Sequence, residues 1–183
     1  MTTRRKFLKT ALKTTAAAAT ILAPVTVLAK TAPVARGERR LKFYNLHTGE
    51  HLRATYWVDG VYVPDEMTAI NRILRDFRTG DIQRMDPHLM DLLFALQHKV
   101  DKRGTFHVIS GYRSPKTNAR LHRASNGVAT RSLHMRGKAI DIRLPGVELG
   151  HLRQAALKLH AGGVGYYPNS NFIHVDTGRP RFW

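Results

Sequence analysis

Alternating apolar and polar positions mark two short strands in the C-terminal half of this chain. Across residues 139–144, alternate aliphatic residues form one face, and Asp141 lies on the other. Across residues 172–176, His174 and Asp176 share one face, and β-branched residues occupy the opposite face. Two such strands can each direct polar side chains toward the same point while their apolar faces pack.

The N-terminal half predicts a hairpin or three-stranded meander followed by two helices. β-rich runs at 41–44 and 54–58 are separated by a turn sequence, and a second turn follows them. The first helix is expected over about 66–78. The second, over about 87–102, opens with a proline, has Asp86 as its cap and carries leucines at helical spacing.

Strands and helices alternate in the rest of the chain. The expected elements are a strand over 105–110, a short helix opened by Ser114 and Pro115, the strand around Asp141, a helix over about 148–161, and strands over 164–167 and 172–176. We expect the last helix to end at Gly162 and Gly163, because glycine tolerates the left-handed conformation of a C-cap. This order predicts one small α+β domain over residues 41–183, with an antiparallel or mixed sheet flanked by helices.

The charge balance of the chain is strongly basic. Lys and Arg outnumber Asp and Glu by 30 to 13 in 183 residues, and the net charge of +17 favours polyanionic partners. A nucleic-acid binder would rest on this charge alone, because no nucleic-acid-reading motif is recognisable, so we expect no nucleic-acid partner. Cysteine is absent, so a metal site must be built from His, Asp or Glu.

Residues 1–29 resemble a bacterial export signal. Arg4 and Arg5 precede a Phe-Leu-Lys sequence, an Ala- and Thr-rich stretch, and a cleavage site that ends at Ala29. The arginine pair is typical of twin-arginine signals, and the uncharged run that follows is shorter than the ~20 residues of a membrane span. We therefore expect delivery to the periplasm by the twin-arginine translocation machinery, with residues 30–40 as a flexible lead-in to the domain.

Two histidines and an aspartate form the candidate metal site: His134, Asp141 and His174. Two imidazoles and one carboxylate are a ligand set for zinc that leaves a fourth position open for water, as catalytic zinc requires. A carboxylate in an otherwise apolar strand is costly to bury without a partner, and Gly137 permits close backbone approach beside it. The remaining histidines lack such a setting and are expected to be surface or hydrogen-bonded residues: His47, His51, His88, His98, His107, His122, His151 and His160.

Several motifs occur in a defined order along the chain. They are Ser110-Gly111-Tyr112-Arg113-Ser114, Ser132-x-His134-x-x-Gly137-x-Ala139-x-Asp141, Gly162-Gly163-Val164-Gly165-Tyr166-Tyr167-Pro168 and His174-x-Asp176. This order resembles the D-alanyl-D-alanine metallopeptidase superfamily, which includes lysostaphin-type and hedgehog-type zinc domains. Within that superfamily the chain is similar to the twin-arginine-exported murein endopeptidases of the MepK type. The resemblance implies a hedgehog/D-Ala-D-Ala-peptidase-like fold.

The resemblance also implies roles for individual residues. His134, Asp141 and His174 would bind one zinc ion per chain. Arg113 would steady the scissile carbonyl or a substrate carboxylate, because its guanidinium is always charged and presents a fixed fork of donors. We expect Ser132 to be a structural hydroxyl in the turn before the first histidine.

The general base departs from the pattern of better-known relatives. Some of them place a His two residues, or a Glu three residues, before the last zinc ligand, and these positions are Phe172 and Asn171 here. Asp176 is the remaining carboxylate of the motif. It is a candidate catalytic base, or else it orients a ligand histidine, and the sequence leaves both roles open.

These features predict zinc-dependent hydrolysis of amide bonds in peptidoglycan peptide cross-links, a murein endopeptidase of cell-wall growth or remodelling. Stem peptides carry free carboxylates that suit a basic protein, so stem peptides and their cross-links are the expected partners. Two alternatives stay open: a non-catalytic peptidoglycan-binding domain of the same fold, and a D,D- or L,D-carboxypeptidase. A serine hydrolase built on Ser132, His134 and Asp141 is disfavoured, because no nucleophile elbow surrounds the serine.

Overall fold

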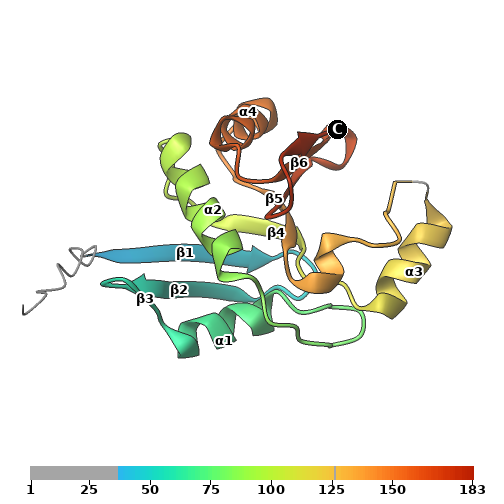
Figure 1. Ribbon diagram of the computed structural model, residues 1–183, viewed down its shortest axis with the longest axis horizontal. Helices are drawn as coiled ribbons and strands as arrows, with labels where there is room; N and C mark the ends of the chain where they lie inside the picture. The colour runs from blue at the N-terminus through green and yellow to red at the C-terminus, as the bar shows by residue number, and fades with distance from the viewer. Residues whose placement is uncertain (1–36, 126) are drawn as a thin grey trace, which may run out of the picture. The chain divides into compact units, whose positions relative to one another are not determined.

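An open mixed sheet of eight strands organises the described part of the protein (Figure 1). The computed structural model describes residues 37–125 and 127–183, and the structural statements below concern these residues. The predicted export signal, 1–29, lies outside them, as does most of the predicted lead-in, 30–40. Within the described ranges, no helix is long and apolar enough to cross a membrane.

The strands combine antiparallel and parallel pairing, in agreement with the predicted mixed sheet. They are β1 Glu38–Asn45, β2 His51–Val58, β3 Val61–Tyr62, β4 Phe106–Ser110, β5 Ala139–Arg143, β6 Gly163–Tyr167, β7 Phe172–Asp176 and β8 Arg181–Phe182. Their order in the sheet is β3-β2-β1-β4-β5-β7-β6-β8. The first three strands form the predicted meander, β4 joins β1 in parallel, and β5, β7 and β6 are antiparallel neighbours.

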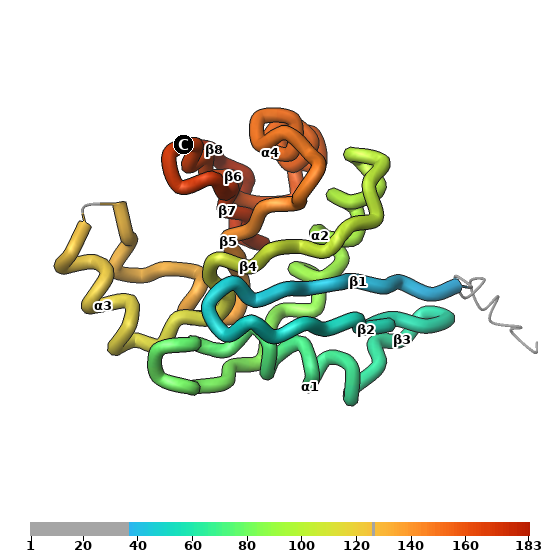
Figure 2. The backbone as a smooth tube through the Cα atoms, turned by 180° about the vertical axis from the view of Figure 1, so that it is seen from behind, coloured from blue at the N-terminus to red at the C-terminus, as the bar shows by residue number. Residues whose placement is uncertain are grey.

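Helices pack against one face of this sheet. The helices are α1 Pro64–Ile73, α2 Pro87–Lys99, α3 Pro115–Ala124 and α4 Leu149–Leu159, with 3-10 turns η1 Leu133–Arg136 and η2 Pro168–Ser170. α1 packs against β2, α2 against β1 and α4, and α4 against β6 and β7. The view from behind shows β1, β2 and β4 in front of α2, with no helix covering them on that side (Figure 2). The predicted α+β class is confirmed.

The apolar faces predicted from alternation form the core between sheet and helices. In β5 and β7 the isoleucines and Val175 are buried, and in α2 four of the predicted leucines are buried. Local capping signals are confirmed as well. Asp86 accepts a hydrogen bond from the backbone N–H of His88 at 3.0 Å, and Ser114 accepts one from that of Thr117 at 3.2 Å.

The domain begins earlier than the sequence predicted. β1 starts at Glu38, inside the predicted lead-in 30–40. Arg39 donates a hydrogen bond to Asp91 of α2 at 2.6 Å, and its guanidinium carbon lies 4.3 Å from the centre of the Trp57 ring. These long-range contacts hold residues 38–40 in the sheet. The local sequence does not indicate a strand there, because it is charged and has no apolar periodicity.

The first helix is shorter than expected. α1 spans Pro64–Ile73 rather than about 66–78. Proline at the first helical turn accounts for the earlier start, because its fixed φ suits that position. After the helix, the buried carboxylate of Asp76 accepts hydrogen bonds from the backbone N–H groups of Arg78 and Ser114, which holds the chain in a turn. A contact with a distant segment therefore ends this helix.

The glycines after α4 have a different role from the predicted one. The helix ends at Leu159, and His160 takes the left-handed conformation with φ of 49°, whereas neither Gly162 nor Gly163 has a positive φ. A Cβ at Gly162 would overlap the backbone carbonyl oxygen of Asp176, and one at Gly163 would overlap that residue's carboxylate. Glycine is required here for close approach to β7.

Candidate metal centre

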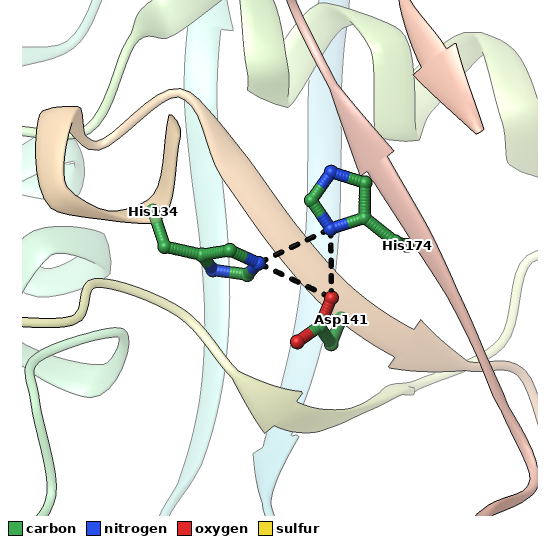
Figure 3. Close-up of side chains that lie close together, drawn as sticks. All are labelled: His134, Asp141 and His174. Carbon is green, nitrogen blue, oxygen red and sulfur yellow. Dashed lines mark hydrogen bonds and ion pairs between the residues drawn. The ribbon is translucent and has the colours of Figure 1, made fainter. Parts of the chain in front are cut away.

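His134, Asp141 and His174 converge from three separate elements (Figure 3). His134 lies on η1, Asp141 on β5 and His174 on β7. Asp141 and His174 are direct cross-strand partners, so the sheet register places them side by side on one face. The structure therefore brings the three predicted side chains together.

The converging atoms are close and buried. Nε2 of His134 lies 3.1 Å from Nδ1 of His174 and 3.2 Å from Oδ1 of Asp141. Nδ1 of His174 lies 2.9 Å from the same carboxylate oxygen. The three residues are between 1% and 8% exposed. Burial of this kind is unusual for polar side chains unless their polar atoms are satisfied.

Each of these side chains has a further partner on its outer side. Nδ1 of His134 lies 2.7 Å from the carbonyl oxygen of Gly111, and Nε2 of His174 lies 2.9 Å from the carboxylate of Asp176. Oδ2 of Asp141 accepts a hydrogen bond from Nη2 of Arg113. Only the inner nitrogen or oxygen of each residue therefore faces the others. Two imidazole nitrogens and one carboxylate oxygen fit a divalent cation, zinc in particular, and the outer partners orient the ligands.

Backbone geometry fixes η1 and with it His134. Ser132 accepts a hydrogen bond from the backbone N–H of His134 at 3.3 Å, which is the structural role expected for this hydroxyl. Gly137 ends the turn with φ of 65°, and a Cβ there would overlap the carbonyl oxygen of Arg84. The close approach predicted at Gly137 is present.

Asp176 lies behind His174, away from the converging atoms. It is fully buried, and its oxygens accept hydrogen bonds from Gly163 and Gly178 backbone N–H groups at 3.0 and 2.8 Å. Both of its oxygens also accept from Arg181, at 3.0 and 2.6 Å. Burial raises the pKa of Asp176, but these contacts outweigh it and hold the pKa well below the ordinary carboxyl range. The carboxylate is thus ionised and saturated with donors.

Arg113 contacts Asp141 and lines the site. It follows β4, donates from Nε to the hydroxyl of Ser110 at 2.8 Å and donates from Nη2 to Asp141. Its backbone N–H donates to the carbonyl oxygen of His134 at 3.3 Å. Through these bonds one residue joins the strand of Ser110, the turn of His134 and the carboxylate of Asp141.

The charges of the centre follow from burial and mutual contact. Burial raises the pKa of Asp141, but its two histidine neighbours and Arg113 outweigh it and hold that pKa far below the usual range. Burial lowers the pKa of His134. Burial acts in the same direction on His174, but hydrogen bonds to Asp141 and Asp176 outweigh it and raise its pKa. An ionised carboxylate and neutral imidazoles are the forms that coordinate metal.

A cleft of about 410 Å³ opens at the three candidate ligands. Besides them, its lining includes Arg113, Arg131, Arg181, Tyr167, Phe172 and Trp183. Among the lining residues of the described chain, Asp141 is the only carboxylate. The cleft is therefore cationic and partly aromatic around its metal-binding end.

The sequence pattern does not predict that the C-terminal residues Arg181 and Trp183 line this cleft. Trp183 donates from Nε1 to the hydroxyl of Tyr167 at 2.8 Å, and its ring centre lies 5.2 Å from that of His174. Arg181 lies in β8, a two-residue strand with no periodicity to detect. Gly165 packs closely against the Trp183 ring, and this contact is evident only in the structure.

The fold and the site together define an α+β protein with a candidate metal centre on one face of its sheet. The family model of the peptidoglycan L,D-endopeptidase MepK matches residues 33–183, and the chain belongs to this family. It is 45% identical to peptidoglycan L,D-endopeptidase MepK of Escherichia coli K12 over 145 residues, covering 79% of this chain and 80% of the relative. A probable peptidoglycan L,D-endopeptidase MepK of Haemophilus influenzae is 44% identical over 146 residues, covering 79% and 78%. The resemblance to MepK-type endopeptidases is confirmed at the level of the family.

Proposed function

We propose that this protein is a zinc-dependent endopeptidase that hydrolyses L,D amide bonds in peptidoglycan cross-links. The observation that carries the proposal is the convergence of His134, Asp141 and His174 at 2.9 to 3.2 Å, at one end of a cationic cleft. The names of the relatives supply the substrate and the L,D stereochemistry. The cleft supports the substrate class, because its arginines offer charge suited to an acidic peptide.

Zinc would be held by Nε2 of His134, Oδ1 of Asp141 and Nδ1 of His174. When bound, it supplies Lewis-acid polarisation of a carbonyl oxygen and lowers the pKa of water. The protein orients the three ligands through their outer partners, Gly111, Arg113 and Asp176. Each of the three ligands therefore has one outer atom held by a partner, as a preformed site requires.

Asp176 acts in this proposal as a positioning residue. Its carboxylate contacts the nitrogen of His174 that points away from the other two ligands, and it does not line the cleft. A base must reach the proton that it removes, within hydrogen-bond distance or through one water. The geometry therefore favours the orienting role over the catalytic one among the two that the sequence left open. Arg181 supports it by holding both carboxylate oxygens.

Arg113 has two roles in this proposal: it orients Asp141, and it presents a positive charge to the cleft. Its bond to Asp141 fixes the carboxylate that faces the metal site, and its guanidinium remains at the wall of the cleft. A fixed positive group there favours the negative charge that develops on an amide oxygen during hydrolysis. Arg131 and Arg181 line the same cleft and suit the free carboxylates of diaminopimelate residues.

The proposal also covers export of the protein to the periplasm and its membership of a structural superfamily. The arginine pair at residues 4 and 5 supports twin-arginine export, and a peptidoglycan substrate is consistent with a periplasmic location. A mixed sheet with two of the three candidate metal ligands on neighbouring strands supports a place in the hedgehog/D-Ala-D-Ala-peptidase-like superfamily.

Purified cross-linked muropeptide dimers test the activity. We expect the zinc-loaded protein to convert dimers joined through two diaminopimelates into monomers, with the products identified by mass. His134→Ala, Asp141→Ala and His174→Ala should each abolish cleavage and reduce bound zinc from about one per chain, because three ligands are needed. His88→Ala, an exposed histidine on α2, is the matched control and should be fully active.

The alternatives predict other products. A carboxypeptidase would release a single terminal amino acid and leave the cross-link intact. A non-catalytic binding domain would bind the dimers and leave them unchanged. Full cleavage in the presence of a chelator, with no metal in the protein, would remove the basis of the proposal.

A further inference from the structure

The metal centre shares one face of the sheet with a row of half-buried and exposed side chains on neighbouring strands. In β5, Asp141 and Arg143 point to the same face, since they are two residues apart in a strand without a bulge. Arg143 is the partner of His107 in β4, and His107 is the partner of Tyr44 in β1. Tyr44 is in turn the partner of His51 in β2.

Ring contacts confirm that these partners share a face. Tyr44 and His51 are stacked with ring centres 4.2 Å apart, and Tyr44 meets His107 edge to face at 5.1 Å. The opposite face of the same strands is the buried one, with Phe43 and Phe106 packed in the core. No helix covers the exposed side of β1, β2 and β4 (Figure 2). The row therefore lies on a face that no helix covers, with His51 exposed and Tyr44, His107 and Arg143 half-buried, and it continues to the metal centre.

Unpaired cations extend this row. Lys42 and Arg53 are direct cross-strand partners, and both are exposed. Within residues 37–125 and 127–183, neither forms an ion pair, and Arg143 forms none either. Like charges placed directly opposite each other destabilise a sheet. This pair also lines a cavity of about 370 Å³ that Phe94 and His98 of α2 complete, and an anionic ligand there would relieve the repulsion.

We propose that this open face is a second binding surface for peptidoglycan, which holds a stem peptide of the polymer while the cleft acts on a neighbouring cross-link. The surface, termed the platform, consists of Lys42, Tyr44, His51, Arg53, His107 and Arg143. The cations bind stem-peptide carboxylates, and the stacked rings offer a flat contact for the peptide or sugar. The proposal rests on the proposed function, because it takes peptidoglycan as the substrate of the cleft.

Distance and surface chemistry favour this occupant. Neighbouring strands lie ~4.8 Å apart, so β1 and β2 are roughly 10 to 15 Å from β5, a span of about three to five extended residues. A membrane is the other anionic partner, but interfacial binding needs apolar side chains to insert. The exposed large apolar residues of the described chain are Val61, Ile82, Phe182 and Trp183, and none belongs to the platform.

The test compares insoluble and soluble substrate. Lys42→Gln with Arg53→Gln removes two platform cations, and Arg72→Gln with Lys158→Gln removes two exposed cations from α1 and α4 as the matched control. We expect the platform variant to bind purified sacculi about 2- to 10-fold more weakly than the wild type, and to digest them correspondingly more slowly. Cleavage of soluble dimers should change by less than twofold. Thermal unfolding checks that the variant folds, and its midpoint should stay or rise because repulsion is relieved.

Several outcomes would overturn the platform. Equal sacculus binding by wild type and platform variant would do so, as would an equal loss in the control variant, since net charge alone would then explain binding. Wild-type binding to vesicles containing phosphatidylglycerol that the platform variant loses, with sacculus binding intact, would identify a membrane surface instead. Failure of the proposed function is separate: it would show as no cleavage of soluble dimers, and sacculus binding would still decide the platform.

Discussion

At the scale of single residues, the orientation of each candidate ligand depends on the side-chain atom that points away from the site as well as on the atom that faces it. His174 can present Nδ1 to the site because its other nitrogen faces Asp176. Asp176 is held in turn by Arg181 and by two backbone N–H groups. The absence of a Cβ at Gly163 makes room for this packing. A glycine, a carboxylate and an arginine outside the ligand set thus orient one imidazole.

Replacing Asp176 by Asn distinguishes its two roles. If it orients His174, zinc affinity should fall by roughly 10- to 100-fold, and added zinc should restore most of the activity, because the metal can still select the correct ring orientation. Competition with a chromophoric chelator measures the affinity independently of catalysis. Asp81→Asn, an exposed carboxylate, is the control. A zinc-saturated variant that is slower by ~10² to 10⁴ would instead support the base.

At the scale of elements, buried polar contacts connect segments that carry the site. Asp76, in the loop after α1, accepts hydrogen bonds from the backbone N–H and the hydroxyl of Ser114, at 2.9 and 2.7 Å. Ser114 is the cap of α3 and follows Arg113 directly. The loop therefore positions the start of α3 and, with it, an arginine of the cleft.

Asp76→Asn should destabilise the protein in a pH-dependent way. Burial raises the pKa of Asp76, but hydrogen bonds from Thr117, Ser114 and Arg78 outweigh it and lower it from 3.8 to about 2. Because the pKa of Asp76 is lower in the folded state, its ionised carboxylate stabilises the fold above pH ~4, and this stabilisation is lost as the pH falls toward 2. The substitution should therefore lower the free energy of unfolding by about 2 kcal/mol at neutral pH. Urea unfolding at both pH values measures this. A difference between wild type and variant that is unchanged at pH 2 would contradict the assignment.

At the scale of the whole molecule, charge and delivery are connected. The chain carries a net charge of +17, and basic side chains recur in the cleft and on the platform. Cationic surfaces raise the local concentration of an anionic polymer and speed encounter with it. A peptidoglycan enzyme must also reach its polymer, and the proposed export through the N-terminal arginine pair would bring it there.

Arg4→Lys together with Arg5→Lys should leave the precursor in the cytoplasm. The twin-arginine route reads the arginine pair as an address, and lysine keeps the charge without keeping that address. Fractionation and immunoblotting measure the periplasmic share. Lys6→Arg with Lys9→Arg is the control and should be exported normally. An unchanged periplasmic yield of the first variant would contradict twin-arginine export.

Local signals were sufficient for most of the fold and for naming the three residues that converge. Alternation around Asp141 and His174 indicated which side chains share a face, and this held because alternation in a strand depends only on neighbouring residues. The caps Asp86 and Ser114 were predictable for the same reason. Motif order supplied the family, which the match over residues 33–183 confirms.

Tertiary structure alone decided how the partners of those residues are arranged. Local alternation placed Asp176 on the same strand face as His174 but left two roles open for its carboxylate. Nothing local indicates that Arg181 returns to bind Asp176, because that contact depends on how β7 and β8 pack against β6. The strand at Glu38 and the close approach at Gly162 likewise arise from contacts with distant segments. Sequence thus determined which chemistry is present, since side-chain type and local periodicity are properties of the chain itself. Three-dimensional packing determined which atom of each side chain faces the site.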